Sequence, residues 1–311
     1  MGPRNNTGLG PVVTNENENL VPGNLDFFKS GVKADGVDRF LYQILQPVST
    51  LTNDGPMEYR VISSHNECVV PSFIKLGGEI KIVKENGTDI TIEDTSSVVN
   101  LPIDSLFSYI TVELNNEQLE HTKFLYPYKA FFEKTLSYSK AAKDTHMSNS
   151  LYYADTPGKF NITATNTGNT GLDERAKHFS KSSSVHFHIP LALDIATLTK
   201  PLPPSTTLKF TFHRQKNDFT LMGESTHKIE IKKLYMEIGK IILSDEVSSA
   251  VSKRFLSNPF IYDFTHTRIL KYTIPAGIHD GSRYAIFNNV SLPRFILIGI
   301  VRQVRKSFVL Y

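Results

Sequence analysis

Histidine and cysteine side chains are the groups in this sequence whose spacing could do chemistry. His65 and Cys68 lie three residues apart, and an imidazole at that distance could activate a thiol as a nucleophile. Cys68 is the only cysteine of the chain, and unpaired cysteines are among the residues most often buried in cores. We therefore favour a buried structural cysteine over a catalytic pair.

A second grouping could begin a metal site. His186 and His188 lie two residues apart in a strand-like segment, so both side chains point to one face. A zinc site needs three or four ligands, but His213 and His227 belong to other segments. We interpret the pair as part of a polar strand face and predict no metal ion.

Enzyme signatures are absent from the sequence. It contains no Walker-type phosphate loop, no GxSxG elbow and no HExxH motif. The acidic pairs Glu93–Asp94 and Asp173–Glu174 fall in predicted loops, where solvated carboxylates are the ordinary outcome. We predict no catalytic residues, no cofactor and no enzyme activity.

The elements that carry these residues read mostly as short strands. Residues 57–63 alternate Met57, Tyr59 and Val61 with polar neighbours, the period-two pattern of a half-buried strand. Similar runs recur along the chain with turn residues between them, and Asn115–Asn116 marks a hairpin turn. This pattern predicts an all-β jelly-roll sandwich rather than alternating strands and helices.

One segment departs from the strand pattern. Pro127 suits the first turn of a helix, and apolar side chains follow it at helical spacing. These side chains are Tyr128, Phe131, Phe132 and Leu136. We predict an amphipathic helix at 127–143 that packs on a sheet through them. The polar stretch 144–184 after it predicts a long loop that projects or meets a neighbouring subunit.

The charge distribution is uneven along the chain. The formal net charge of +3 is too small to indicate a nucleic-acid or membrane partner by itself. Residues 251–311, however, hold nine Lys or Arg against two Asp. A candidate nucleic-acid-facing patch within this region consists of Arg294, Arg302, Arg305 and Lys306. A solvated strand face is the alternative interpretation of the same residues.

The composition also bounds the surroundings of the protein. Residues 1–24 hold six Asn, three Pro and four Gly, which predicts a flexible N-terminal arm. One cysteine cannot form an intrachain disulfide, and this suits a reducing compartment. The sequence shows no signal peptide and no apolar run of about 18 residues, so we predict neither secretion nor a membrane span.

Three stretches carry a resemblance to a known family. They read LTNDGPMEYRVISS, LPIDSLFSYITVELNNEQLE and YPYKAFFEKTLSYSKAAKDTHMSNSLYYADTPGKF. In this order they resemble the double jelly-roll major capsid-type proteins of Maverick/Polinton elements, adintovirus-like viruses and their endogenous invertebrate relatives. The resemblance extends over residues 25–305 and is most specific between residues 100 and 160.

The resemblance implies a structural capsid protein located in the virion and assembled in the host nucleus or cytoplasm. Such a protein self-associates, as trimers, and joins other capsid subunits in an icosahedral shell, with weak contact to packaged DNA. It also implies two jelly rolls, a first at 25–225 and a second at 226–311. No second helix like 126–138 is recognisable, so we expect the second roll to be abbreviated, to be a truncated copy, or to be completed by another chain.

Two other functions fit the same strands. One is a penton or minor capsid protein of the same lineage, with a single complete roll. The other is a β-sandwich module that binds carbohydrate or a receptor, in which the tyrosines of SLYYADT stack on sugars.

Overall fold

The computed structural model describes residues 36–49, 51, 55–94, 96–223, 226–272, 293–294 and 296–299. The predicted arm at 1–24 lies outside these residues. The unit described below begins at Val37.

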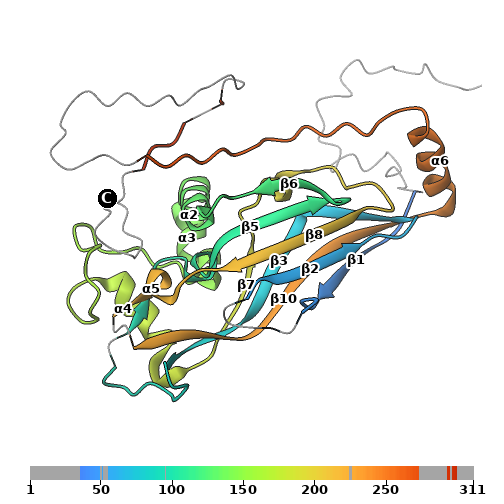
Figure 1. Cartoon of the computed structure of the whole chain (residues 1–311). Helices are drawn as coiled ribbons and strands as arrows, with labels where there is room; N and C mark the ends of the chain where they lie inside the picture. Colours follow the sequence, from blue (N-terminus) through green and yellow to red (C-terminus); the bar gives the residue numbers. More distant parts are fainter. Residues whose placement is uncertain are drawn as a thin grey trace, which may run out of the picture. The chain divides into compact units, whose positions relative to one another are not determined.

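Two antiparallel sheets of four strands each form the main body of the described residues (Figure 1). The first sheet has the order β1–β10–β3–β7, with bounds Val37–Leu45, His227–Leu243, Glu67–Lys84 and Val185–Pro190. The second has the order β2–β8–β5–β6, with bounds Met57–Ile62, Thr207–Arg214, Phe107–Leu114 and Glu117–His121. A small sheet pairs β4 (Ser97–Val98) with β9 (Leu221–Met222).

The strand pairing is nested. β1 pairs with β10, β2 with β8, β3 with β7, and β5 with β6. A long antiparallel ribbon is thus folded back at its middle and rolled over two sheets, which defines a jelly roll. Asn115 and Asn116 close the middle turn with φ angles of 51° and 69°, the left-handed conformation that a two-residue hairpin needs. The predicted all-β jelly roll and this turn are confirmed.

The predicted boundary between two rolls at residues 225 and 226 is wrong. β10 pairs with both β1 and β3, so it closes the first roll and cannot open a second one. It is followed by α6 (Asp245–Phe255) and by residues 256–272, in which the described structure has no strand. Most of the remaining span of the predicted second roll lies outside the described residues, so a second roll stays a prediction.

The core lies between the two sheets and is built by inward-facing positions of both. Tyr59, Phe107, Phe210 and Phe212 are fully buried there. The ring of Phe212 meets Tyr59 and Phe107 edge-on, with centroids 5.5 and 5.0 Å apart. Burying each large apolar side chain contributes about 1.5–3 kcal/mol, so the alternation of strands such as β2 accounts for the sandwich.

The predicted helix at 127–143 is two helices in the structure. α2 spans Tyr126–Ser137 and α3 spans Lys140–Asp144. The chain is extended at Tyr138, where φ is −94° and ψ is 137°. The hydroxyl of Ser139 then accepts a hydrogen bond from the Ala142 N–H and caps α3. A capping serine therefore divides what reads as one helical pattern.

The predicted loop at 144–184 is largely ordered by buried contacts. It contains η2 (His146–Ser150), α4 (Thr170–His178) and η3 (Ser180–Ser182). Arg175 of α4 is 1% exposed and donates hydrogen bonds to the carbonyls of Val98 and Tyr153. It also pairs with Asp155 at 2.7 Å within the stretch, while the hydrogen bond to Val98 ties the stretch to the roll. The remaining short helices are α1 (Pro102–Ser105), η4 (Asp194–Thr197) and α5 (Asn217–Thr220).

Candidate functional surfaces

His65 and Cys68 do not form a catalytic pair in the described structure. Cys68 is buried on β3, and burial raises the pKa of its thiol, which disfavours the reactive thiolate. The His65 side chain is exposed, and its backbone carbonyl accepts a hydrogen bond from the Ser248 hydroxyl. The thiol is therefore protonated and shielded, as expected for a structural cysteine.

His186 and His188 lie on the outer face of β7 beside carboxylates of neighbouring strands. His188 Nε2 is 3.1 Å from Glu237 Oε2, and His186 Nδ1 is 4.0 Å from Glu79 Oε2. Within the described ranges no group of three or more His, Cys, Asp or Glu side chains is placed to hold a metal ion. The two histidines lie beside carboxylates on a polar strand face.

A Ser–His–Asp arrangement that sequence spacing could not reveal joins the segment before β4 to β10. Ser96 Oγ lies 2.5 Å from His227 Nδ1, and Asp94 Oδ1 lies 3.7 Å from His227 Nε2. Ser96 and His227 are each 4% exposed, so both side chains lie beneath the surface of the roll. A substrate could not reach Ser96 in this state, so we assign the arrangement a structural role. We predicted a solvated carboxylate at Asp94, but its side chain is only 13% exposed and lies against His227.

The four predicted packing residues of α2 do not share one packing face. Tyr128 and Phe131 pack against a small apolar cluster, Phe132 is half-buried, and Leu136 is 61% exposed. The cluster consists of Val99, Leu172 and Met222. The helix turns Tyr126, Ala130 and Lys134 toward the roll instead, at positions i, i+4 and i+8.

Buried charges hold α2 over the roll. Lys129 Nζ lies 2.8 Å from Glu120 Oε1 of β6 and 2.6 Å from Asp194 Oδ1 of η4, and all three side chains are at most 4% exposed. Burial lowers the pKa of Lys129, but the negative charges of Glu120 and Asp194 outweigh it, so that this pKa is raised. Lys134 pairs with the buried Asp104 at 2.8 Å in the same way.

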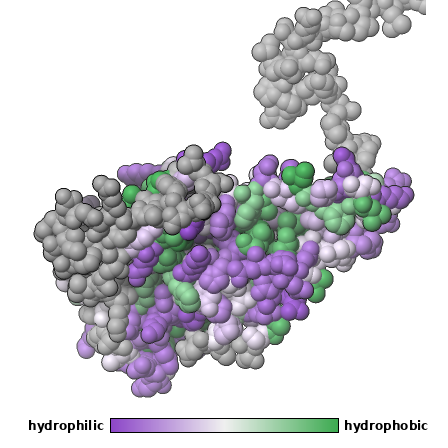
Figure 2. Space-filling view, turned by 45° about the horizontal axis from the view of Figure 1, so that its top comes forward, coloured by the Kyte–Doolittle hydropathy of each residue, from purple (hydrophilic) through white to green (hydrophobic). Residues whose placement is uncertain are grey.

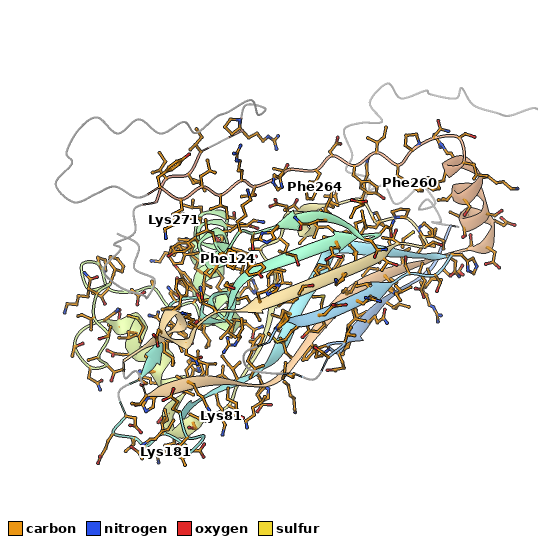
Figure 3. The ribbon with its side chains drawn as sticks, in the orientation of Figure 1. Lys81, Phe124, Lys181, Phe260, Phe264 and Lys271 are labelled. Atoms are coloured by element: carbon orange, nitrogen blue, oxygen red, sulfur yellow. The ribbon has the colours of Figure 1, made fainter. Side chains whose placement is uncertain are left out.

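Residues 256–272 lie along the roll and meet the same charges. The Thr267 N–H donates a 2.6 Å hydrogen bond to Asp194 Oδ2, and the Tyr262 hydroxyl donates to the Pro201 carbonyl. Tyr262 and Phe264 pack against the core, and Phe260, Phe264 and Lys271 mark the course of the segment in Figure 3. Figure 2 turns this side toward the viewer and shows hydrophobic patches within a mostly hydrophilic surface.

The outer face of the first sheet carries exposed aromatic rings. Phe40, Tyr42 and Phe73 are 41%, 53% and 37% exposed, and their ring centroids lie 5.0 to 6.0 Å apart. Ile44, on the same side of β1, is 60% exposed. Gly239 lies beneath, where a Cβ would come within 2.9 Å of Phe40 and 2.8 Å of Phe73. We name Phe40, Tyr42, Ile44 and Phe73 the aromatic face.

The outer face of the second sheet carries ion pairs. Lys209 Nζ lies 3.3 Å from Glu113 Oε1 and 3.7 Å from Glu58 Oε2, and Arg60 lies 3.2 Å from Glu58. We name Glu58, Arg60, Glu113 and Lys209 the charged face. Such pairs satisfy one another and water at the same time, so this face is suited to solvent.

Two further predictions concern the basic patch and the tyrosines of SLYYADT. Arg294 is exposed, whereas Arg302, Arg305 and Lys306 lie outside the described residues, so the basic patch stays a prediction. Tyr152 and Tyr153 of SLYYADT are half-buried, and the Tyr153 hydroxyl lies 2.7 Å from His178 Nε2. They do not form the exposed platform that stacking on sugars would need. Among the described helices, none combines the length and the apolar character that crossing a membrane requires.

At the sequence level the chain is only distantly similar to known proteins. No protein-family model matches it. An uncharacterized protein of Caenorhabditis elegans is 21% identical over 264 residues, which cover 80% of this chain and 59% of that protein.

Similar solved structures come from viruses. Three of them are the Sputnik virophage structure, the Faustovirus major capsid protein and the mavirus major capsid protein, with sequence identities of 14%, 10% and 15% and TM-scores of 0.45, 0.42 and 0.35. The matches cover 72%, 74% and 79% of this chain and 52%, 58% and 54% of those chains, in the same order. The chain thus spans between 52% and 59% of the length of these four proteins.

Proposed function

We propose that this protein is a structural capsid protein that works by associating with copies of itself, and not by catalysis. The observation that carries the proposal is the aromatic face on the outside of a closed jelly roll. Soluble monomers rarely leave large contiguous apolar patches open to water, and such patches usually mark interaction sites. The resemblance of the three sequence stretches to major capsid-type proteins supports the same function.

The positions of the residues that could take part in catalysis or metal binding agree with a structural role. Cys68 is buried and protonated, and Ser96 and His227 are closed off from solvent. His186 and His188 are occupied by carboxylates at the sheet surface. The described residues therefore suit binding through the protein surface. On that surface, burial of the aromatic face would drive association through the hydrophobic effect.

We further propose trimers as the unit of association and an icosahedral shell in the virion as their destination, with assembly in the host nucleus or cytoplasm. Other capsid subunits would be the partners of these trimers. The basic residues Arg294, Arg302, Arg305 and Lys306 are candidates for weak contact with packaged DNA.

A second candidate is a penton or minor capsid protein of the same lineage. It is favoured by one observation, that the described residues contain a single roll with its closing strand β10 in place. This candidate differs from the first in symmetry, because it predicts pentamers and not trimers.

The test is the solution mass of the full chain by light scattering over a range of concentrations, with negative-stain images of the same samples. We expect trimers, or rings and shells built from them. Pentamers would transfer the function to the penton candidate. A monomer at every concentration, without particles in the images, would contradict both.

A further inference from the structure

Strand β1 is an edge of the first sheet. It pairs with β10 along one side, and no strand in the described ranges pairs with its other side. An open strand edge presents a row of N–H and C=O groups that can pair with another chain. The aromatic face lies directly beside this edge, because Phe40, Tyr42 and Ile44 belong to β1 itself. An occupant of the edge would therefore also cover aromatic rings.

The sequence of β1 is nearly symmetric about its middle residue. It reads VDRFLYQIL, with Leu41 at the centre. Positions at equal distance from Leu41 match in character: Phe40 with Tyr42, Arg39 with Gln43, and Val37 with Leu45. Asp38 with Ile44 does not match, and a β-bulge between Val37 and Arg39 shifts the register there, so the symmetry that strand pairing can use covers residues 39–43. A twofold axis places such symmetric positions opposite each other, so this pattern fits a second copy of the same strand.

We propose that β1 pairs antiparallel with β1 of a second copy of this chain, about a twofold axis at Leu41. The two first sheets then continue into one sheet across the interface. This inference rests on the proposed function, because it names the twofold contact through which one trimer joins the next in the shell.

The first consequence concerns the aromatic rings. In this register Phe40 lies opposite Tyr42 of the second copy, and Tyr42 lies opposite Phe40 of the second copy. Side chains of directly opposed residues are neighbours on one face of an antiparallel pair, and aromatic pairs stabilise it. The two aromatic faces therefore merge into one patch, and each shields rings of the other from water.

A second, independent observation comes from Gln43. Its Oε1 is buried and has no hydrogen-bond partner in the described structure. The pairing places Arg39 of the second copy opposite Gln43, and Arg39 is exposed in the single chain. Arginine offers several N–H donors, so a turn of the Gln43 side chain toward the strand edge on pairing would bring its amide oxygen, buried in the single chain, to a donor of the second copy. The twofold axis creates the same contact a second time, between Arg39 of the first copy and Gln43 of the second copy.

Moving the twofold axis by one residue in either direction separates Arg39 from Gln43 and Phe40 from Tyr42. With the axis at Phe40, Asp38 would lie opposite Tyr42 of the second copy. With the axis at Tyr42, Arg39 would lie opposite Leu45 of the second copy. An axis between two residues would set inward-facing positions against outward-facing ones, which the alternation of a strand forbids. The axis at Leu41 is therefore the one to test.

A cysteine at the axis tests the register directly. Directly opposed residues of an antiparallel pair have Cα atoms about 4.5–5.5 Å apart, within disulfide range. In a full chain carrying Cys68→Ala, we expect Leu41→Cys to form a covalent dimer on mild oxidation. The matched control is Gln43→Cys in the same background. Its two copies would be offset by four residues along the strand, about 13 Å, and could not bridge.

We expect at least tenfold more disulfide dimer for Leu41→Cys than for Gln43→Cys on a non-reducing gel. Equal amounts, or none for Leu41→Cys, would overturn the pairing. Because a core-facing cysteine could impair folding, Phe40→Lys provides a second test with Leu41 kept. A lysine on an edge strand opposes pairing, so the dissociation constant of the β1 contact should rise at least tenfold while the circular dichroism stays that of the folded protein. An unchanged dissociation constant would also overturn the pairing.

The same samples separate this inference from the proposed function. If wild-type protein assembles by light scattering but Leu41→Cys is not crosslinked, the β1 pairing is wrong and the shell function stands. If wild-type protein is monomeric at every concentration and no crosslink forms, both are wrong.

Discussion

The two outer faces of the roll cover the same core, yet they carry opposite chemistry. On the first sheet the outward positions hold the rings of Phe40, Tyr42 and Phe73, which lie over Gly239. On the second sheet the outward positions hold Lys209 between Glu58 and Glu113. An antiparallel sheet with one buried face needs only its inward residues to be apolar. The outward residues are thus free to differ, and here they distinguish a face suited to a partner from a face suited to water.

The free energies of ion pairing and of apolar burial indicate which face can drive association. A solvated ion pair contributes about 0–1 kcal/mol, because the charges are well hydrated before they meet. Removing apolar surface from water contributes about 25 cal/mol per Å², so a few rings buried between two copies outweigh several such pairs. The aromatic face is therefore the side on which we place self-association.

The largest expected loss of stability comes from removing a buried charge, compared with removing a charge of the charged face. Lys129→Met leaves Glu120 and Asp194 buried without their cation, and we expect a loss of about 3–5 kcal/mol in the free energy of unfolding. Lys209→Met removes a lysine of the charged face, and we expect a loss of about 0–1 kcal/mol. Urea unfolding followed by circular dichroism measures both. Equal losses would mean that the charged face is not the solvated surface described here.

A smaller effect should come from the support beneath the aromatic rings. Gly239→Val places side-chain atoms where Phe40 and Phe73 now lie, and overpacking of this kind costs about 1–3 kcal/mol. The matched control is Thr211→Val on the outer side of β8, where we expect a change within about 0.5 kcal/mol. Thermal unfolding of the two variants compares the faces. If Gly239→Val is as well tolerated as the control, the rings do not depend on the glycine.

The smallest effect concerns a link between the two sheets. Lys240 Nζ on β10 donates hydrogen bonds to the Ile62 carbonyl of β2 and to Glu67 of β3. The hydrogen bond from Lys240 is the main cause that lowers the pKa of Glu67 below its usual value of 4.5. As the pH falls through this range the unfolded chain takes up the proton first, so the stability that Glu67 provides at neutral pH is lost in acid.

Glu67→Gln should therefore be slightly less stable than the wild type at pH 7, by less than about 1 kcal/mol because Glu67 is partly exposed. The two proteins should converge in stability as the pH falls below 4.5 and through the lowered pKa of folded Glu67. Urea unfolding at a series of pH values measures this difference. A constant difference at all pH values would show that the ion pair does not contribute.

Local patterns predicted the fold well. The alternation of β2 and the two asparagines at 115–116 depend on neighbours in sequence, and both appear as expected. β10 was misassigned because its role depends on β1, near the opposite end of the described chain. A strand pattern shows that a strand exists but not which strand it meets.

The site residues were harder to predict for the same reason. Lys129 lies on a helix where a lysine usually faces solvent, and its partner Asp194 is 65 residues away. Ser96 and His227 are separated by 131 residues, so no spacing in the sequence relates them. Leu136 fitted the helical stripe but lies at the end of α2, where the roll no longer covers it.

The most direct test of the account compares the two faces by light scattering at equal protein concentration. The three samples are wild type, Phe40→Lys/Tyr42→Lys on the aromatic face, and Thr111→Lys/Thr211→Lys on the outer side of the second sheet. Both variants add the same charge, and circular dichroism checks that each is folded. We predict that the wild type and the second-sheet variant associate alike, while the aromatic-face variant stops at trimers and forms no rings or shells. Association that is unchanged in the aromatic-face variant, or lost in the second-sheet variant instead, would contradict the account.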